Sequence, residues 1–129
     1  MPRVVAKARC LPTEDSSKVR KAILNLFPSS ETEELEGSLV AITSDLERFK
    51  ELIRNYRILD STRKVLLRGV MGRSTIFHVN KQAAFVGKVS FVDRPTPLGS
   101  IEVSIEDDDI EKLIDRISPV TVNGEEVAA

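Results

Sequence analysis

Hydrophobic and polar residues alternate in five stretches of the chain, and a period of two is typical of strands that bury one face. In the first stretch Val4, Ala6 and Ala8 share one side, while Arg3 and Lys7 lie on the other. We therefore expect this strand to have a basic outer side. The alternation predicts strands over residues 3–11, 33–43, 75–79, 85–91 and 101–105.

Between these strands hydrophobic residues recur every three or four positions, which is the spacing of an amphipathic helix. Polar side chains that can accept the free N–H bonds of a first turn precede three of the helices, within residues 13–16, at Ser44 or Asp45, and at Asp60. Gly69 is expected to end the third helix. The pattern predicts helices over residues 19–27, 46–56, 60–68 and 110–117.

The predicted order is strand, helix, strand, two helices, two or three strands, and a helix. Because strands follow one another in sequence, we expect an α+β fold: a largely antiparallel sheet of four to five strands with helices packed on one face. Residues 69–73 and 93–100 have the glycines and prolines of a flexible turn and a loop. A length of 129 residues favours a single domain over 1–129, with residues 122–129 as a frayed tail.

The composition indicates an ordinary folded protein, with 41% hydrophobic and 30% charged residues. Cys10 is the one cysteine, so an intrachain disulfide cannot form, and a reducing compartment is favoured. The chain has no run of ~20 apolar residues, and its first residues lack the apolar stretch of a signal peptide. We expect a cytoplasmic protein that does not contact the membrane.

Charge is segregated along the chain, although the formal net charge is only −1. Residues 48–88 contain ten Lys or Arg and two acidic residues, whereas residues 31–47 contain six acidic residues and no base. Residues 102–126 contain nine acidic residues and two basic ones. A basic segment between two acidic ones creates a local positive field, which is what a phosphate-binding surface requires.

The basic segment supplies two kinds of candidate RNA contact. Lys and Arg bind phosphate, and Arg can hold two oxygens at once. Asn and Gln have both donor and acceptor groups, and from a turn between strands they could read a base edge or a 2′-hydroxyl. Two readings remain open, since the cations could be ordinary solvated faces and Asn80 could serve its own turn. The candidate residues are Arg54, Arg57, Arg63, Lys64, Arg68, Arg73, Asn80, Lys81, Gln82 and Lys88.

No other pattern in the sequence predicts an active site. His78 is the one histidine, and with Cys10 it cannot complete a typical zinc site. No nucleophile elbow supports a hydrolase triad. The acidic run 106–109 is expected to open a helix, where carboxylates offset the helix dipole, and Tyr56 is expected in the core with the phenylalanines. We expect no metal, no cofactor and no enzymatic activity.

Four segments resemble those of a family of small archaeal proteins described as RNA-binding. They are residues 12–15 (Pro-Thr-Glu-Asp), 57–63 (Arg-Ile-Leu-Asp-Ser-Thr-Arg), 80–88 (Asn-Lys-Gln-Ala-Ala-Phe-Val-Gly-Lys) and 97–103 (Pro-Leu-Gly-Ser-Ile-Glu-Val). The resemblance extends over residues 3–118, and its third segment is the most specific. It implies a fold like that of the ribosomal protein that binds 5S rRNA, an archaeal source, a cytoplasmic location and RNA as the partner. It implies no catalytic residues.

Together these features predict a non-enzymatic domain that binds the phosphate backbone of structured RNA, ribosomal or transfer RNA among them, through a basic surface from residues 54–88. The prediction depends on the cations converging on one solvent-facing surface. The alternative is a protein–protein interaction module, or a homodimer, in which basic and acidic faces meet.

Overall fold

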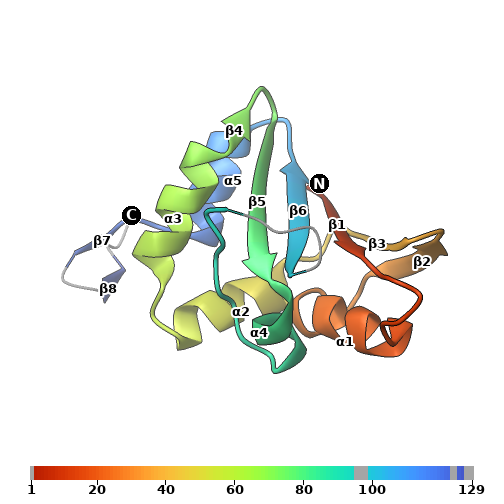
Figure 1. The fold of residues 1–129 in the computed structure, drawn as a ribbon. Helices are drawn as coiled ribbons and strands as arrows, with labels where there is room; N and C mark the ends of the chain where they lie inside the picture. Colours follow the sequence, from red (N-terminus) through yellow and green to blue (C-terminus); the bar gives the residue numbers. More distant parts are fainter. Residues whose placement is uncertain (1, 95–98, 123–124, 127–129) are drawn as a thin grey trace.

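The computed structural model describes residues 2–94, 99–122 and 125–126, and these residues form one six-stranded antiparallel sheet and a separate two-stranded one (Figure 1). The strands of the large sheet are β1 (Arg3–Arg9), β2 (Glu31–Leu35), β3 (Ser38–Thr43), β4 (Val70–Met71), β5 (Ser74–Asn80) and β6 (Ser100–Glu106). Their spatial order is β2-β3-β1-β6-β5-β4. The first strand of the chain therefore lies in the interior of the sheet, paired on both sides.

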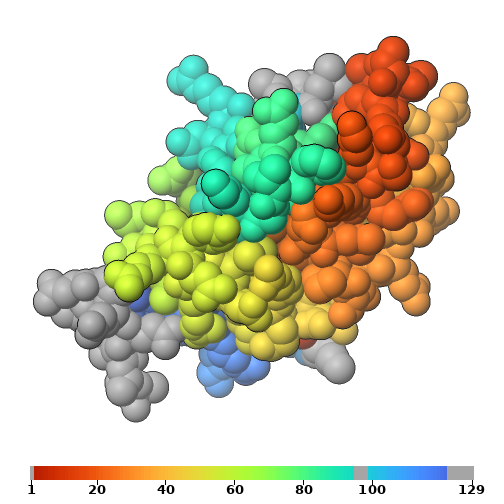
Figure 2. All heavy atoms as spheres, turned by 90° about the horizontal axis from the view of Figure 1, so that it is seen from below, coloured from red at the N-terminus to blue at the C-terminus, as the bar shows by residue number. Residues whose placement is uncertain are grey.

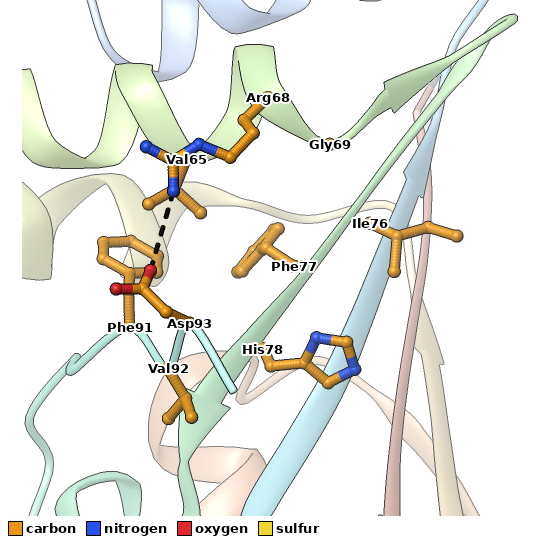
Figure 3. A pocket seen from close by; sticks show the side chains of 9 residues that line it. All are labelled: Val65, Arg68, Gly69, Ile76, Phe77, His78, Phe91, Val92 and Asp93. Carbon is orange, nitrogen blue, oxygen red and sulfur yellow. Dashed lines mark ion pairs between the residues drawn. The ribbon is translucent and has the colours of Figure 1, made fainter. Parts of the chain in front are cut away.

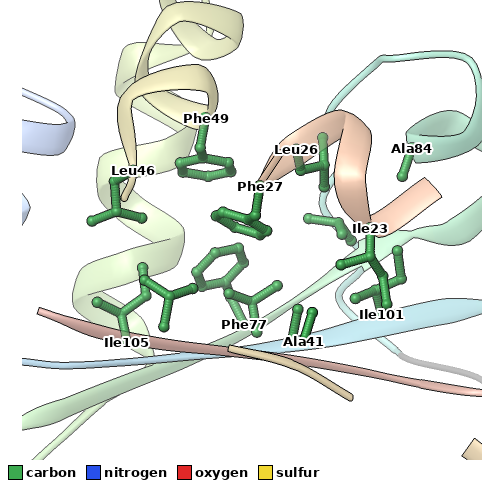
Figure 4. Packing of buried hydrophobic residues seen from close by; sticks show 14 of the residues in the cluster. Ile23, Leu26, Phe27, Ala41, Leu46, Phe49, Phe77, Ala84, Ile101 and Ile105 are labelled. Carbon is green, nitrogen blue, oxygen red and sulfur yellow. The ribbon is translucent and has the colours of Figure 1, made fainter. Parts of the chain in front are cut away.

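Helices cover one face of this sheet, and the core fills the space between the two layers (Figure 4). They are α1 (Ser16–Leu26), α2 (Glu47–Asn55), α3 (Leu59–Arg68), α4 (Lys81–Phe85) and α5 (Ile110–Ile117). Alternation along β1 separates the two faces, because Val4, Ala6 and Ala8 are buried while Arg3 and Lys7 are exposed. The predicted α+β class and antiparallel sheet are confirmed.

A row of aromatic rings connects the layers. Phe27 after α1 stacks on Phe49 of α2 with ring centroids 5.6 Å apart, and Phe49 lies 5.8 Å from Phe77 of β5. Phe77 in turn meets Phe91 edge-on at 5.8 Å. Such contacts add to the hydrophobic gain from burial, and they fix the segment around Phe91 against the sheet.

The sheet has six strands, more than the four to five predicted, because a turn divides one predicted strand and a predicted turn contains a further short strand. The predicted strand 33–43 is a hairpin of β2 and β3, and Gly37 in its turn has a left-handed φ of 76°. Residues 69–73, predicted as a flexible turn, contain β4 and its hairpin to β5, with Gly72 at φ 64°. Glycine takes these angles at little cost. In residues 33–43 the hydrophobic alternation continues through the turn and does not mark it, and the two residues of β4 are too few to show an alternation.

The predicted strand over residues 85–91 is wrong. Asn80 accepts a hydrogen bond of 2.8 Å from the N–H of Ala83 and caps α4, so the chain turns into a helix at that point. The following segment pairs with β5 at an isolated bridge between Val79 and Phe91. Its alternating apolar residues are partly buried against the core, which produces the same pattern as a strand.

The helix ends agree in part with the sequence. Asp15 caps α1, Asp45 accepts the N–H of Glu47 at 2.9 Å, and Gly69 ends α3, as predicted. Asp60 does not cap α3 but lies within its first turn and accepts a hydrogen bond from the hydroxyl of Thr121. The predicted burial of the tyrosine at position 56 is also wrong, because α2 ends before it and the side chain is 48% exposed.

Two predictions lie partly outside the described residues. Residues 95–98 belong to the predicted loop 93–100 and to the last of the resembling segments. Within the predicted tail 122–129, residues 123–124 and 127–129 are not described, while β7 (Thr121–Val122) pairs with β8 (Glu125–Glu126).

Candidate nucleic-acid interface

The connection between α2 and α3 presents Arg57 in a rare backbone conformation. The N–H of Arg57 bonds to the carbonyl of Arg54 at 3.1 Å, and the N–H of Ile58 bonds to the carbonyl of Ile53 at 3.0 Å. These two bonds form a Schellman motif, whose left-handed position is usually glycine. Here it is Arg57, with φ 56°, and its side chain is exposed.

The outer side of α3 carries two more cations one turn apart. Lys64 is exposed, and it has no ion-pair partner within the described part of the chain. Arg68 approaches Asp93 at 3.6 Å, but both side chains are more than 70% exposed. An exposed ion pair of this length contributes little, about 0–1 kcal/mol, so a phosphate could replace the carboxylate.

Beside Arg68 lies a cleft of about 220 Å³ between α3, β5 and residues 91–93 (Figure 3). Phe77 points toward Phe91 and Val65 on its inner side, whereas the imidazole of His78 lies on the other side of β5. His78 approaches Glu102 at 3.6 Å there. The histidine therefore does not join the Arg68–Asp93 pair in one reactive group.

Two of the predicted contacts have structural roles. The guanidinium of Arg63 lies 2.7 Å from Asp115 and 3.1 Å from the carbonyl of Ser118, and it fastens α3 to α5. Lys81 is 8% exposed, so it cannot serve as a solvent-facing phosphate contact. Its placement in a turn between strands is wrong, because it is the first residue of α4.

The ammonium of Lys81 fastens α4 to the start of α1. It donates to the carbonyl of Arg9 at 2.8 Å and to Oε2 of Glu14 at 3.1 Å. The backbone N–H of Leu11 lowers the pKa of Glu14, and Lys81 acts in the same direction. Two segments that carry the family resemblance, residues 12–15 and 80–88, thus meet at this ion pair.

The remaining three predicted residues are not part of the main group of cations. Arg73 is in the β4–β5 hairpin turn, where it approaches Asp108 at 3.7 Å, at the end of the molecule opposite α4 (Figure 1). The side chain of Asn80 is occupied by the cap of α4, which agrees with the local alternative that the sequence left open. Gln82 is exposed on α4.

Five of the predicted cations are exposed on the helices and on the segments that connect them. Seen from below, α2, the start of α3, and the segment around α4 lie side by side with α1 (Figure 2). We call the five exposed cations that the sequence predicted as RNA contacts on α2, on the α2–α3 connection, on α3 and after α4 the corner surface. The corner surface comprises Arg54, Arg57, Lys64, Arg68 and Lys88.

Cations outside the predicted basic segment lie beside α4. Lys18 and Lys21 project from α1 toward α4; Lys18 lines a cleft there, and Lys21 Nζ lies 5.0 Å from the centre of the Phe85 ring. Asn25 bonds to the carbonyls of Ala84 and Phe85, which keeps α1 and α4 together. The sequence shows these lysines on the polar side of a helix, but it does not show that α1 packs beside α4.

The opposite face of the large sheet is open and mixes apolar with charged residues. Register places Ile42, Val5, Ser104 and Ile76 in one row across the sheet, and Ile76 and Ile42 are about 40% exposed. On the basic outer side of β1, Lys7 is level with Glu102 of β6, and on its other side Val40 of β3 separates it from Glu33 of β2. We call this the open sheet face.

The described residues contain no group of three or more His, Cys, Asp or Glu side chains that could hold a metal ion. Among the helices of the described chain, none has the length and hydropathy of a membrane span.

Comparison with known proteins gives consistent matches. A family model described as RNA binding matches residues 3–107. A UPF0201 protein of Methanocaldococcus jannaschii is 44% identical over 129 residues, covering 94% of this chain and 75% of that protein. A UPF0201 protein of Metallosphaera sedula is 40% identical over 132 residues, covering 96% of this chain and 92% of that protein. The crystal structure of a UPF0201 protein from Methanococcus jannaschii has a TM-score of 0.90 at 42% identity and covers 98% of this chain and 99% of that one.

Proposed function

This chain belongs to the archaeal UPF0201 family and to the family whose model is described as RNA binding, and on that premise we propose that it binds structured RNA by its phosphate backbone. The binding surface is the corner surface, and the domain catalyses no reaction. Ribosomal and transfer RNA offer the folded phosphate backbones that such a surface fits, and both are available in the cytoplasm, where we expect the protein to act.

The observation that carries this proposal is the conformation of Arg57. A left-handed residue other than glycine costs about 1–2 kcal/mol, and here the side chain forms no ion pair within the described chain. Strained residues are commonly kept where function needs the side chain. An exposed arginine held at a helix corner, close in sequence to Arg54 and to the start of α3, is suited to a bidentate phosphate contact.

Binding by the corner surface would act through counterion release. Each phosphate neutralised by Lys or Arg frees condensed cations, so affinity falls as salt rises. Five contacts predict a slope of about −4.5 in log K against log salt, or roughly a 500-fold loss between about 50 and 200 mM salt. The phenylalanines of the large sheet and of α1 and α2 are buried, so that sheet has no aromatic platform for bases, which favours backbone recognition.

RNA titrations at two salt concentrations test the proposal. The double change Lys64→Glu/Lys88→Glu alters two exposed side chains of the corner surface and should reduce the salt slope by about 1.8. The matched control is Lys112→Glu/Arg116→Glu, which reverses two exposed cations on α5 and leaves the corner surface intact. Equal RNA binding by both double variants would refute the proposed surface.

The open sheet face favours a second candidate function, association with another copy of this chain. Two copies of this face could pack together. The largely aliphatic row of one copy would cover that of the other, and the acidic strands of one copy would lie over the basic strand β1 of the other. Sedimentation of the wild type and of Ile42→Lys/Ile76→Lys distinguishes the two functions. A dimer that dissociates in this variant, together with no affinity for RNA, would favour association over RNA binding.

A further inference from the structure

A second cleft, of about 410 Å³, lies between the first half of α1 and α4. Its volume falls within the range of about 300–1,000 Å³ that is typical of pockets for small ligands. α1 and the segment around α4, which form its two sides, lie next to each other on the face that Figure 2 shows. It is lined by Glu14, Asp15, Lys18, Val19, Ala22, Lys81, Gln82, Phe85 and Val86.

The floor of this cleft is apolar. Val19 and Ala22 are buried beneath it, Phe85 is half-buried, and Val86 is 63% exposed. An exposed valine next to an aromatic ring offers a flat apolar contact of the kind that a nucleic-acid base can cover. Most of the Val86 side chain makes no packing contact within the fold, so a bound molecule could cover this apolar area and remove it from water.

Polar groups surround the floor. Gln82 is exposed at the edge and has both a donor and an acceptor. The ammonium of Lys81 has three N–H bonds, and Arg9 and Glu14 accept two of them, so one N–H bond has no acceptor within the described chain. The charges of Glu14 and Lys81 compensate each other. Asp15 adds one negative charge, and its carboxylate accepts hydrogen bonds from Ser17, while Lys18 and Lys21 add two positive charges at the rim.

We propose that this cleft receives one unpaired base of the bound RNA. The base would cover Phe85 and Val86, its edge would bond to Gln82, and its phosphate would lie near Lys18 and Lys21 on α1. This inference rests on the proposed function and adds a preference to it. The corner surface binds any suitably folded backbone, whereas the cleft selects RNA with a nucleotide outside the base-paired stack.

The combination of groups favours a nucleotide as the occupant. A flat apolar floor, an amide at the edge and a pair of cations one helical turn apart match the base, the base edge and the phosphate in turn. The ammonium of Lys21 lies over the ring of Phe85, 5.0 Å from its centre, so the apolar and cationic parts of the site are adjacent, and a base that stacks on this side of the ring would move Lys21 toward its phosphate. This arrangement reads a single nucleotide without needing a long single strand.

The test uses two RNA hairpins with the same stem, one fully paired and one with a single bulged 2-aminopurine. We expect the wild type to bind the bulged hairpin about tenfold more tightly, within the range measured for stacking of one base on a protein aromatic group. The fluorescence of 2-aminopurine should rise on binding, because the base leaves the RNA stack.

Val86→Glu should abolish both the preference and the fluorescence change while leaving affinity for the paired hairpin within about twofold. Since Val86 is exposed, this variant avoids the damage to the core expected of Phe85→Ala. Gln82→Ala should reduce the preference, and Val120→Glu, the same change at a 54% exposed site, should not.

Equal binding of the two hairpins by the wild type, or equal effects of Val86→Glu and Val120→Glu, would overturn the base site while leaving backbone binding intact. Wild-type protein that binds neither hairpin would overturn both proposals. Loss of affinity for both hairpins in Lys64→Glu/Lys88→Glu, with the preference retained, would support both and separate the two surfaces.

Discussion

Replacing Arg57 by glycine should make this protein more stable and a weaker RNA binder. The two bonds of the Schellman motif, 3.1 and 3.0 Å long, use backbone atoms and survive the change. Removing the side chain at φ 56° relieves about 1–2 kcal/mol, while the extra freedom of glycine in the unfolded chain costs about 0.5–1 kcal/mol. The free energy of unfolding should therefore rise by about 0.5–1 kcal/mol.

RNA affinity should change in the opposite direction. Loss of one phosphate contact removes about 0.9 from the salt slope, which corresponds to roughly a fivefold loss of affinity near physiological salt. Urea denaturation measures stability, and titration with a structured RNA at several salt concentrations measures the slope. The matched control is Arg57→Ala, which loses the same cation but keeps the left-handed strain.

The two variants should thus bind RNA equally weakly and differ in stability. Unchanged RNA affinity in both would refute the assignment of Arg57 to the RNA surface. Lower stability of Arg57→Gly than of the wild type would show that the arginine side chain stabilises the fold, and that the strain argument is mistaken.

Three further predictions concern the fold. Gly69→Ala should lower the free energy of unfolding, measured by urea denaturation, by about 1–3 kcal/mol, because the added Cβ would lie 2.2 Å from the carbonyl oxygen of Ile76. Lys81→Met should lower the free energy of unfolding by about 2–3 kcal/mol, because it leaves the Glu14 carboxylate and the Arg9 carbonyl without their donor. The double variant Lys81→Met/Glu14→Gln should recover part of that loss in the same assay. The Leu11 N–H lowers the folded-state pKa of Glu14 below its usual 4.5. This carboxylate therefore stabilises the fold above that pH, and its contribution disappears as pH falls through the lower folded pKa. In thermal unfolding from pH 6 to 2, the melting temperature of Glu14→Gln should decline less than that of the wild type.

Burial separates the predicted cations into two kinds. Lys81 and Arg63 are close in sequence to Lys64 and Lys88, and all four have the same charge. The first two are held by carboxylates and carbonyls between elements, and the other two remain exposed. A chain-wide count of charge therefore overestimates the phosphate-binding surface, because part of that charge fastens helices to one another.

Local patterns in the sequence determined most of the elements. A period of two defines β1 and β6, and the hydrophobic spacing of α1 and α5 defines those helices, since each of these patterns depends on neighbouring residues alone. The caps at Asp15 and Asp45 follow from side-chain chemistry in the same way. The segregation of charge along the chain is also visible in the sequence, and it is one basis for proposing RNA as the partner.

Only the tertiary structure decided which segments meet. The packing of α1 against α4 brings Glu14 to Lys81, forms the cleft at Phe85 and adds the lysines of α1 to the basic face. The left-handed conformation of Arg57 arises because the chain must reverse between two packed helices. These features depend on contacts between residues far apart in the sequence, and periodicity carries no information about such contacts.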